Sequence, residues 1–316
     1  MSTPHKKNIL VTGGAGFIGS AITEKLAADP SHNVIVIDNL LTGDEKRVTS
    51  SGRPNISFIR GNVNSHNDIS AIFLSNRIDY VFHYAAVVGV QRTLQNPVMV
   101  LKDILGMRHI TSLAKTAGVK RIFFSSSSEV YGEPVEFPQN EETTPLNSRL
   151  PYAIVKNAGE AFLKAFRQEF GLHYTIFRFF NTYGPQQSSD FVMSKFLRAA
   201  LKNEPLYIHG DGSQSRTFCY IDDNTDACLS AFYGNKCVDE VVNIGNDNEI
   251  SILDLARTII RVTGSRSEII HGPALKEGDM TRRRPDVTKM KQLLGRDMLP
   301  LEEGIRRILN DPKFIS

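Results

Sequence analysis

The chain has little cysteine, no long apolar run and no marked excess of either charge. Its three cysteines, Cys219, Cys228 and Cys237, are odd in number and form no CxxC pair, which argues against a disulfide framework and against a zinc site. Free thiols are typical of a reducing cytoplasm, where we expect the protein to act. We expect no metal in its site.

Membrane and nucleic-acid partners are also disfavoured. No apolar run approaches the ~20 residues that span a bilayer, and the opening residues MSTPHKKNILVTGG lack the small-residue cleavage site of a signal peptide. The formal charge is only +3 over 316 residues, and Lys and Arg are spread along the chain apart from RRR at 282–284. Such a weak basic balance does not favour nucleic acid.

Short apolar runs alternate with stretches of helical spacing in the first half of the chain. This alternation predicts right-handed βαβ units, and so an α/β fold with a Rossmann-type parallel sheet covered by helices on both faces. The second half predicts a smaller mixed α/β part, and we place the boundary between 1–177 and 178–316, with the chain crossing between the two. The expected strands are 7–12, 33–38, 56–61, 79–86 and 121–126, and the expected helices are 67–76, 97–117, 191–201 and 250–264, the last capped by Ser251 and Gly264.

Three glycines follow the first expected strand at a spacing typical of dinucleotide binding. Gly13, Gly16 and Gly19 allow a tight turn, a close approach of the backbone to a pyrophosphate, and close helix packing. Asp38 ends the second strand, 19 residues after Gly19. A carboxylate at this place accepts hydrogen bonds from the ribose hydroxyls and repels a 2′-phosphate. The pattern predicts NAD rather than NADP. The alternative is a glycine-rich structural turn.

The stretch SSSSEVYG at 125–132 places four hydroxyls and a carboxylate at the end of the strand 121–126. Serine tracts are often solvated linkers. Ligand sites of parallel sheets, however, lie at the carboxyl ends of the strands. The position of this stretch therefore favours a site.

A phenol and an ammonium follow at helical spacing. Tyr152 and Lys156 are four residues apart, so a helix places them on one face. The lysine charge and a bound nicotinamide cation both favour phenolate, which predicts a lowered pKa for the Tyr152 phenol and a role as a base. A hydroxyl of the serine tract is then available to hold a substrate alcohol.

Together these motifs resemble the extended short-chain dehydrogenase/reductase family of NAD-dependent nucleotide-sugar epimerases, dehydratases and decarboxylases. The resemblance covers nearly the whole chain. It implies a nucleoside-diphosphate sugar as substrate, oxidation of the sugar at C4 by NAD, and usually return of the hydride. The motifs that carry it are TGGAGFIG (12–19), VID (36–38), HYAA (83–86), SSSEVYG (126–132), YAIVK (152–156), RFFNTYGP (178–185), GDGSQSRTFCYIDD (210–223), VNIGN (242–246) and RRRPD (282–286).

The resemblance implies a role for each matching residue. The catalytic residues would be Ser127, Glu129, Tyr152 and Lys156, and the substrate contacts Ser128, Asn181, Arg216 and Arg283. The guanidinium groups suit phosphate oxygens. The structural alternatives are surface charge for the two arginines and a capping carboxylate for Glu129. The NAD contacts would be Tyr152, Lys156, Gly13, Gly16, Phe17, Ile18, Gly19, Asp38, Asn39, Asn62, Val63, Ala85 and Ala86.

The resemblance also implies a homodimer and separate roles for the two parts of the chain. Family members commonly form homodimers through two helices from each subunit, here 97–117 and 152–170. Residues 1–177 would bind NAD and carry the catalytic residues, and 178–316 would mainly bind the nucleotide sugar. A non-catalytic, cofactor-sensing protein of the same fold is a competing hypothesis, but such proteins usually lack the tyrosine or the lysine.

Glu129 bears on the reaction type. SSSEVYG is most similar to the TSEVYG of UDP-glucuronate decarboxylases, with Ser127 in place of threonine. A 4-keto group makes the C5 carboxylate of a glucuronate a β-keto acid, which loses CO₂ easily. The segment VVGVQRTLQNP (87–97) is more similar to epimerases or dehydratases, so UDP-sugar 4-epimerase and dehydratase stay open. Asn62 and Asp103 also depart from the family, which usually has aspartate and asparagine there.

Overall fold

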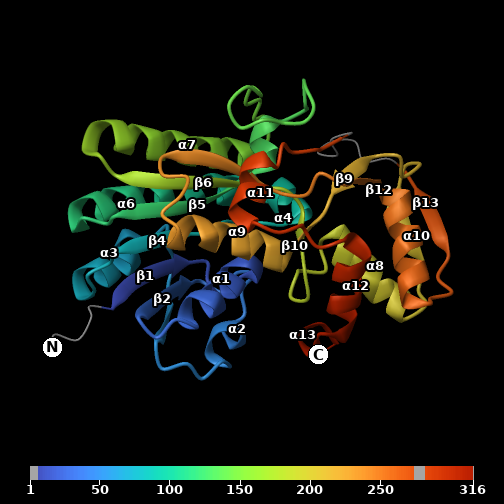
Figure 1. Ribbon diagram of the computed structural model, residues 1–316, viewed down its shortest axis with the longest axis horizontal. Coiled ribbons are helices and arrows are strands. Elements are labelled where there is room, and N and C mark those ends of the chain that lie inside the picture. Colours follow the sequence, from blue (N-terminus) through green and yellow to red (C-terminus); the bar gives the residue numbers. More distant parts are fainter. Residues whose placement is uncertain (1–5, 274–281, 316) are drawn as a thin grey trace.

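The structure is a computed structural model that describes residues 6–273 and 282–315. At its centre is a seven-stranded sheet with the order β11-β6-β5-β4-β1-β2-β3, in which all neighbouring strands are parallel (Figure 1). The predicted Rossmann-type sheet is confirmed. The strands are β1 (Lys7–Thr12), β2 (His32–Asp38), β3 (Ile56–Arg60), β4 (Tyr80–His83), β5 (Arg121–Ser127), β6 (His173–Phe179) and β11 (Glu240–Ile244).

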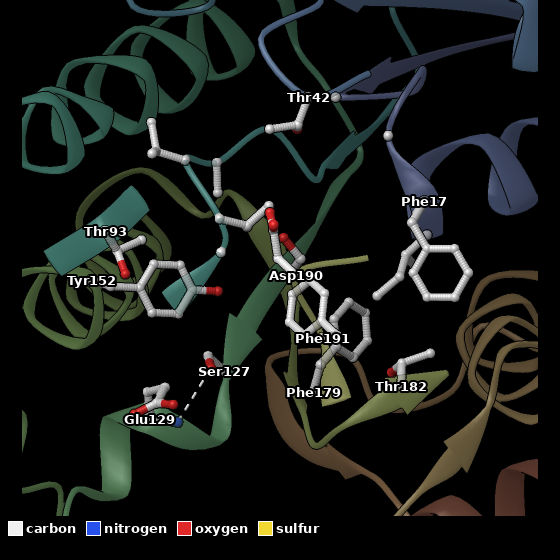
Figure 2. A pocket seen from close by; sticks show the side chains of 18 of the residues that line it. Phe17, Thr42, Thr93, Ser127, Glu129, Tyr152, Phe179, Thr182, Asp190 and Phe191 are labelled. Carbon is white, nitrogen blue, oxygen red and sulfur yellow. Dashed lines mark hydrogen bonds between the residues drawn. The ribbon is translucent and has the colours of Figure 1, made fainter. Parts of the chain in front are cut away.

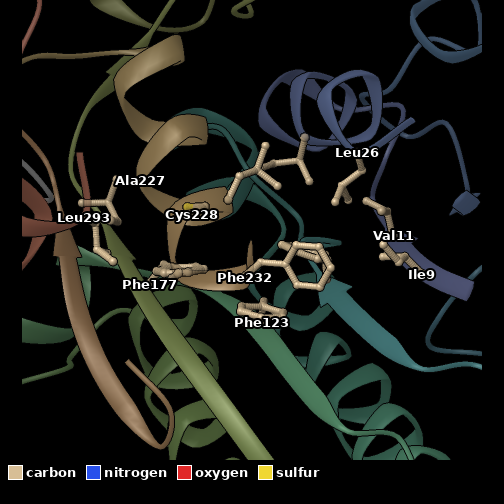
Figure 3. Packing of buried hydrophobic residues seen from close by; sticks show 14 of the residues in the cluster. Ile9, Val11, Leu26, Phe123, Phe177, Ala227, Cys228, Phe232 and Leu293 are labelled. Atoms are coloured by element: carbon tan, nitrogen blue, oxygen red, sulfur yellow. The ribbon is translucent and has the colours of Figure 1, made fainter. Parts of the chain in front are cut away.

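Helices cover both faces of this sheet because the strand side chains alternate between two cores. In β1, Ile9 and Val11 belong to one core and Leu10 to the other. The first core is shown in Figure 3, where Phe232 packs edge-on against Phe123 at a centroid distance of 5.7 Å. Its helices are α1 (Phe17–Ala27), α2 (Lys46–Thr49), α9 (Ile221–Tyr233) and α11 (Thr288–Leu294), and the second core has α3 (His66–Ser75), α6 (Asp103–Ala117) and α7 (Pro151–Phe170).

A smaller part with its own core lies at the end of the molecule opposite the N-terminus (Figure 1). Its helix α10 (Ile252–Thr263) begins at Ser251, whose hydroxyl accepts from the Asp254 N–H at 3.0 Å, and ends at Gly264 with φ +66°. Both predicted caps are confirmed. The other elements here are α8 (Val192–Leu201), α12 (Leu301–Asn310), α13 (Pro312–Ile315), and the strand pairs β8 (Leu206–His209) with β13 (Ile269–Gly272) and β9 (Ser215–Thr217) with β12 (Glu249–Ser251).

The remaining elements are short. They are α4 (Val90–Gln95), α5 (Pro97–Leu101), the 3₁₀ helix η1 (Ser128–Tyr131), and β7 (Thr182–Tyr183) paired with β10 (Cys219–Tyr220). The boundary expected at 177/178 falls inside β6, and α9, β11 and α11 return to the layers of the large sheet. The division into an NAD-binding and a substrate-binding part stays a prediction.

Two predicted elements differ in detail. The helix expected over 97–117 is divided at Lys102 into α5 and α6, because the Leu105 N–H bonds to the Lys102 carbonyl three residues back rather than four. The strand expected to reach 86 ends at His83, since the Thr12 hydroxyl accepts from the N–H groups of Tyr84 and Ala85. Within the described ranges, no helix combines the length and apolar character that crossing a membrane requires.

The contact between α1 and the glycine turn gives a stability prediction. A Cβ added to Gly19 would lie 2.2 Å from the Gly13 carbonyl oxygen, a backbone atom that cannot turn aside. We expect Gly19→Ala to lower the free energy of unfolding by about 1–3 kcal/mol, as overpacking does. Gly272→Ala is the matched control, because its Cβ would meet nothing nearer than 3.7 Å. Urea unfolding measures both variants, and equal stability of the two would contradict the contact.

Candidate active site

A large cavity runs along the carboxyl ends of the strands, at the point where the strand order reverses between β1 and β4. Its volume of about 1280 Å³ exceeds the roughly 300–1,000 Å³ of ordinary small-molecule pockets. Its walls come from the glycine turn, the end of β5, the first turns of α7, and the segments around α8, β8 and β9. All nineteen residues to which the sequence assigned a catalytic, cofactor or substrate role line this one cavity.

At one end of the cavity, the glycine turn and Asp38 form a fixed cradle. Gly13 has φ +69°, and a Cβ there would lie 2.6 Å from the Ala85 nitrogen, so only glycine fits. The buried Asp38 carboxylate accepts from the N–H groups of Ala15 at 3.0 Å and Leu40 at 2.8 Å. These bonds hold the carboxylate beside the N-terminus of α1.

The serine tract is buried, and each of its hydroxyls has a defined partner. The Ser125 hydroxyl donates to the His83 carbonyl at 3.3 Å, and the Ser126 hydroxyl to the Glu160 carboxylate at 2.6 Å. Ser127 ends β5, and its hydroxyl accepts from the Glu129 N–H at 3.2 Å, the bond drawn in Figure 2. The tract is therefore the end of a core strand and not a solvated linker.

Tyr152 and Lys156 lie on the first turns of α7, as predicted. The Tyr152 hydroxyl points into the cavity (Figure 2), and the Ser127 hydroxyl is close enough to lower the pKa of the phenol. The buried Lys156 ammonium donates to the Ser125 carbonyl at 2.5 Å and lies 5.8 Å from the centre of the Tyr152 ring. The structure thus brings the hydroxyl, the phenol and the ammonium together.

The sequence predicts a lowered pKa for Tyr152, and this prediction is wrong when only the burial and charges of the protein itself are counted. Burial raises the pKa of the phenol, and the nearby carboxylates of Glu129 and Asp103 raise it further. The Ser127 hydroxyl and the Arg283 charge oppose this rise without overcoming it. Burial also lowers the pKa of Lys156 to about 8, which the Asp103 carboxylate partly counteracts.

Glu129 and Arg283 form an ion pair inside the cavity. The Arg283 guanidinium donates to the Glu129 carboxylate at 2.6 Å and to the Ser128 hydroxyl at 3.4 Å. Arg283 is only 6% exposed, which rules out the surface-charge alternative. The carboxylate of Glu129 meets a guanidinium rather than a helix end, so the structure does not support the capping alternative for this side chain.

The other predicted contacts are spread along the cavity. Asn181 and Arg216 lie on its wall by the smaller part, where Asn181 donates to the Thr217 carbonyl at 3.2 Å and Arg216 to the Ser215 carbonyl at 2.7 Å. Neither is a fully exposed surface residue. Beyond β3, Asn62 is exposed, and its amide oxygen accepts from the backbone of the same loop. The remaining predicted NAD contacts, Gly16, Phe17, Ile18, Gly19, Asn39, Val63, Ala85 and Ala86, line the wall between these ends.

The sequence motifs missed some of the lining. Thr93 of α4 and the loop residues Asp190 and Phe191 also enter the cavity, and no role was assigned to them (Figure 2). The role of Asp103 was also missed, although its departure from the family was noticed. Its carboxylate accepts from the Val87 N–H at 2.7 Å and from the Asn64 amide at 3.0 Å, so it ties together the loops after β3 and β4.

Comparison with known proteins identifies the family. The model described as "NAD dependent epimerase/dehydratase family" matches residues 9–245. The chain belongs to this family. It is 35% identical to UDP-glucuronic acid decarboxylase 1 of Danio rerio over 98% of the chain and 73% of that protein. It is 36% identical to the UDP-N-acetyl-alpha-D-glucosaminuronate decarboxylase of Bacillus cytotoxicus over 91% of the chain and 92% of that protein.

Among solved structures, the UDP-glucose 4-epimerase of Thermotoga maritima with UDP-glucose has a TM-score of 0.89 and 35% identity, over 96% of this chain and 97% of that one. As a member of the NAD-dependent epimerase/dehydratase family, this chain is an enzyme that uses NAD. The site fits that cofactor. The turn at Gly13 and Gly19 has no room for a side chain, and the carboxylate of Asp38 is held where ribose hydroxyls bind.

The Asp103 carboxylate generates a prediction about pH. It raises the pKa of Lys156, so Asp103→Asn lowers that pKa below its value of about 8. Turnover that needs the charged ammonium is lost as pH rises through this pKa, so the alkaline limb of the pH–rate profile should move to lower pH. Asp190→Asn is the control, because Asp190 lines the same cavity and is not among the charges that shift Lys156. An unmoved limb in Asp103→Asn would contradict this account.

Proposed function

We propose that the protein oxidises C4 of a nucleoside-diphosphate sugar transiently and uses the 4-keto sugar to decarboxylate a UDP-hexuronate. The observation that carries the proposal is the Glu129–Arg283 ion pair, which stands in the cavity beside Ser127 and Tyr152. A 4-epimerase needs no acid at this place. The two decarboxylases named above, at 35% and 36% identity, give the proposal independent support.

In the proposed mechanism, the chain's own residues handle the protons. Bound NAD⁺ supplies the hydride acceptor and a positive charge. The Tyr152 phenolate removes the proton of the C4 hydroxyl, while the Ser127 hydroxyl holds the same oxygen. Lys156 lies 5.8 Å from the phenol ring, and its charge, together with the Ser127 hydroxyl, stabilises the phenolate.

The 4-keto group then activates the carboxylate on C5. The bond between C5 and the carboxylate carbon breaks, CO₂ leaves, and the electron pair moves into the C4 carbonyl as an enolate. C5 then takes up one proton from solvent, which reaches it through a water bound by the Glu129–Arg283 pair. The return of the hydride to C4 completes the cycle and leaves a UDP-pentose.

We assign the nucleotide end of the substrate to the wall around Asn181 and Arg216, with Ser128 and Arg283 nearer the sugar. Asn181 and Arg216 lie on the cavity wall by the smaller part, and a guanidinium is suited to diphosphate oxygens. UDP is the nucleotide that the decarboxylases and the epimerase are named for. The unpaired thiols of all three cysteines support a cytoplasmic location.

A UDP-sugar 4-epimerase is the second candidate. The structure of the Thermotoga maritima epimerase, with UDP-glucose, is as similar in identity as the decarboxylases are. Dehydration is less well supported, because Ser128 stands where the resemblance places an aspartate in dehydratases. A non-catalytic role is disfavoured, since Ser127, Tyr152 and Lys156 are all present and in contact or close proximity.

The substrate test uses UDP-glucuronate, UDP-N-acetylglucosaminuronate, UDP-glucose and dTDP-glucose, with products read by NMR and mass spectrometry. We expect loss of CO₂ from a UDP-hexuronate. Glu129→Gln should then reduce decarboxylation about 10²-fold or more, as loss of a general acid or base does. Interconversion of UDP-glucose and UDP-galactose with no change in mass, undiminished in Glu129→Gln, would instead establish the epimerase.

The role of Tyr152 is tested separately. Tyr152→Phe removes one hydroxyl from the ring and leaves its apolar contacts in place, so affinity for NAD and for the UDP-sugar should stay within a few-fold of wild type. Turnover should fall by about 10²–10⁴-fold, the contribution of a positioned base. Isothermal titration and product assays measure the two quantities. Full turnover in this variant would rule out the mechanism.

We also propose a homodimer formed by the outer faces of α5, α6 and α7. Large apolar side chains that would be unusual on an isolated surface cluster there: Val98 (68% exposed), Leu101 (44%), Leu105 (40%) and Ile154 (44%). The two neighbouring helices α6 and α7 lie side by side along one flank of the molecule (Figure 1).

Light scattering after size exclusion tests the dimer. We expect wild type to have twice the mass of the chain and Val98→Glu to dissociate, because a carboxylate in an apolar interface loses its hydration. Leu74→Glu is the matched control, since Leu74 is 86% exposed on α3, which is not one of the three helices of the proposed interface. A monomeric wild type, or a Val98→Glu variant that stays dimeric, would contradict the proposal.

A further inference from the structure

One face of α7 contacts the three serines that end β5. Tyr152, Lys156 and Glu160 follow one another at a spacing of four residues, which places them on the same side of the helix. Tyr152 lies near Ser127, Lys156 donates to the Ser125 carbonyl, and Glu160 accepts from the Ser126 hydroxyl at 2.6 Å. The first two residues of this face have places in the proposed reaction. Glu160 has none so far.

Glu160 belongs to a buried ion pair. Its carboxylate accepts two bonds from the Arg178 guanidinium of β6, at 2.9 and 2.7 Å, and the two side chains are 1% and 2% exposed. The same guanidinium donates to the Tyr131 hydroxyl at 2.9 Å, and that hydroxyl donates to the Asn243 amide oxygen at 2.8 Å. One buried network therefore joins α7, β5, β6, η1 and β11.

Stability alone is a poor explanation for such a pair. Desolvating two charges costs several kcal/mol per ion, and apolar residues of similar volume often stabilise a core equally well. A bidentate ion pair fixes the relative orientation of its two side chains, which apolar packing does not do. Here the orientation matters, because Arg178 holds Tyr131 at the end of η1, and Glu129 lies two residues earlier in that short helix.

We propose that Glu160 and Arg178 are positioning residues, which fix the register between the end of β5 and α7 and thereby hold the Ser127 hydroxyl against the Tyr152 phenol. The proposal rests on the function proposed above. Through Ser126, the pair sets the strand immediately before Ser127. Through Tyr131, it sets the η1 turn that carries Glu129. Neither residue touches the reacting atoms, and neither lines the cavity.

Ser126→Ala is the mildest test, because it removes the hydroxyl that meets Glu160 and leaves the ion pair whole. Glu160→Gln is the second variant, with the same shape and no charge. We expect kcat to fall about 10- to 100-fold, since small misplacements of reacting groups cost up to that much, with KM and NAD affinity within threefold of wild type. The Ser127 hydroxyl lowers the pKa of Tyr152, so displacing it should also move the acid limb of the kcat profile to higher pH.

Asp223→Asn is the matched control. Asp223 is a carboxylate of 1% exposure that pairs with Arg296 at 2.6 Å and accepts from the Leu299 N–H, and it lies outside the cavity. We expect it to lower the thermal midpoint as Glu160→Gln does, with kcat and its pH profile unchanged. The positioning role is wrong if Ser126→Ala and Glu160→Gln lose activity only in proportion to their unfolded fraction, as the control does. If Glu160→Gln does not fold, Ser126→Ala decides alone.

A crystal structure of Ser126→Ala separates this proposal from the proposed function. We expect the Ser127 and Tyr152 hydroxyls to lie farther apart than in a crystal structure of wild type, a result that does not depend on any substrate. An unchanged distance between the two hydroxyls would overturn the positioning role. Absence of turnover by wild type on every UDP-sugar would overturn the proposed function and leave the structural result to decide the positioning role.

Discussion

The site depends on the contact between the carboxyl end of β5 and one face of α7. The last three residues of β5 are serines at the carboxyl end of the sheet. The phenol, the ammonium and the carboxylate of α7 lie next to them. Because these groups are buried, each needs a partner, and the partners fix where the reactive hydroxyls point. The glycine turn, the cavity wall and Arg283 are all arranged around this contact.

The charges around Tyr152 show how the cavity controls its chemistry. Glu129 and Asp103 raise the pKa of the phenol, as burial does, whereas Arg283 and the Ser127 hydroxyl lower it. The chain by itself therefore keeps the phenol protonated at neutral pH. His83 adds no charge beneath the site, because its burial and the nearby Lys156 lower its pKa to about 3. In the proposed mechanism, the positive charge of bound NAD⁺ would favour the phenolate, and proton removal would then be restricted to the loaded enzyme.

Local motifs predicted much of the fold and site. Gly13, Asp38, Tyr152 and Lys156 are found from spacing along the chain, since a turn, a strand end and a helix face each involve only a few consecutive residues. The strands of the Rossmann-type sheet follow in the same way from short apolar runs. The register of α7 against β5 does not, because nothing in the sequence around Glu160 or Arg178 marks them as partners.

Long-range pairings account for what the sequence did not predict. Arg283 meets Glu129 across 154 positions, and the Tyr131 hydroxyl meets Asn243 across 112. No spacing rule covers such distances. The direction of the Tyr152 pKa was wrong for a related reason, since Asp103 and Glu129 approach the phenol from other elements. The division of the expected helix at Lys102 also depends on a tertiary contact, the bonds that Asp103 makes to the loops after β3 and β4.

The central claim is that C4 of the sugar is oxidised before any other bond changes. Chemical quenching during a single turnover of the NAD-loaded enzyme with UDP-glucuronate tests it most directly. The account predicts that reduced nicotinamide and a 4-keto sugar appear together in equal amounts and then disappear as the UDP-pentose forms. Accumulation of product while neither species is present at any time would contradict it.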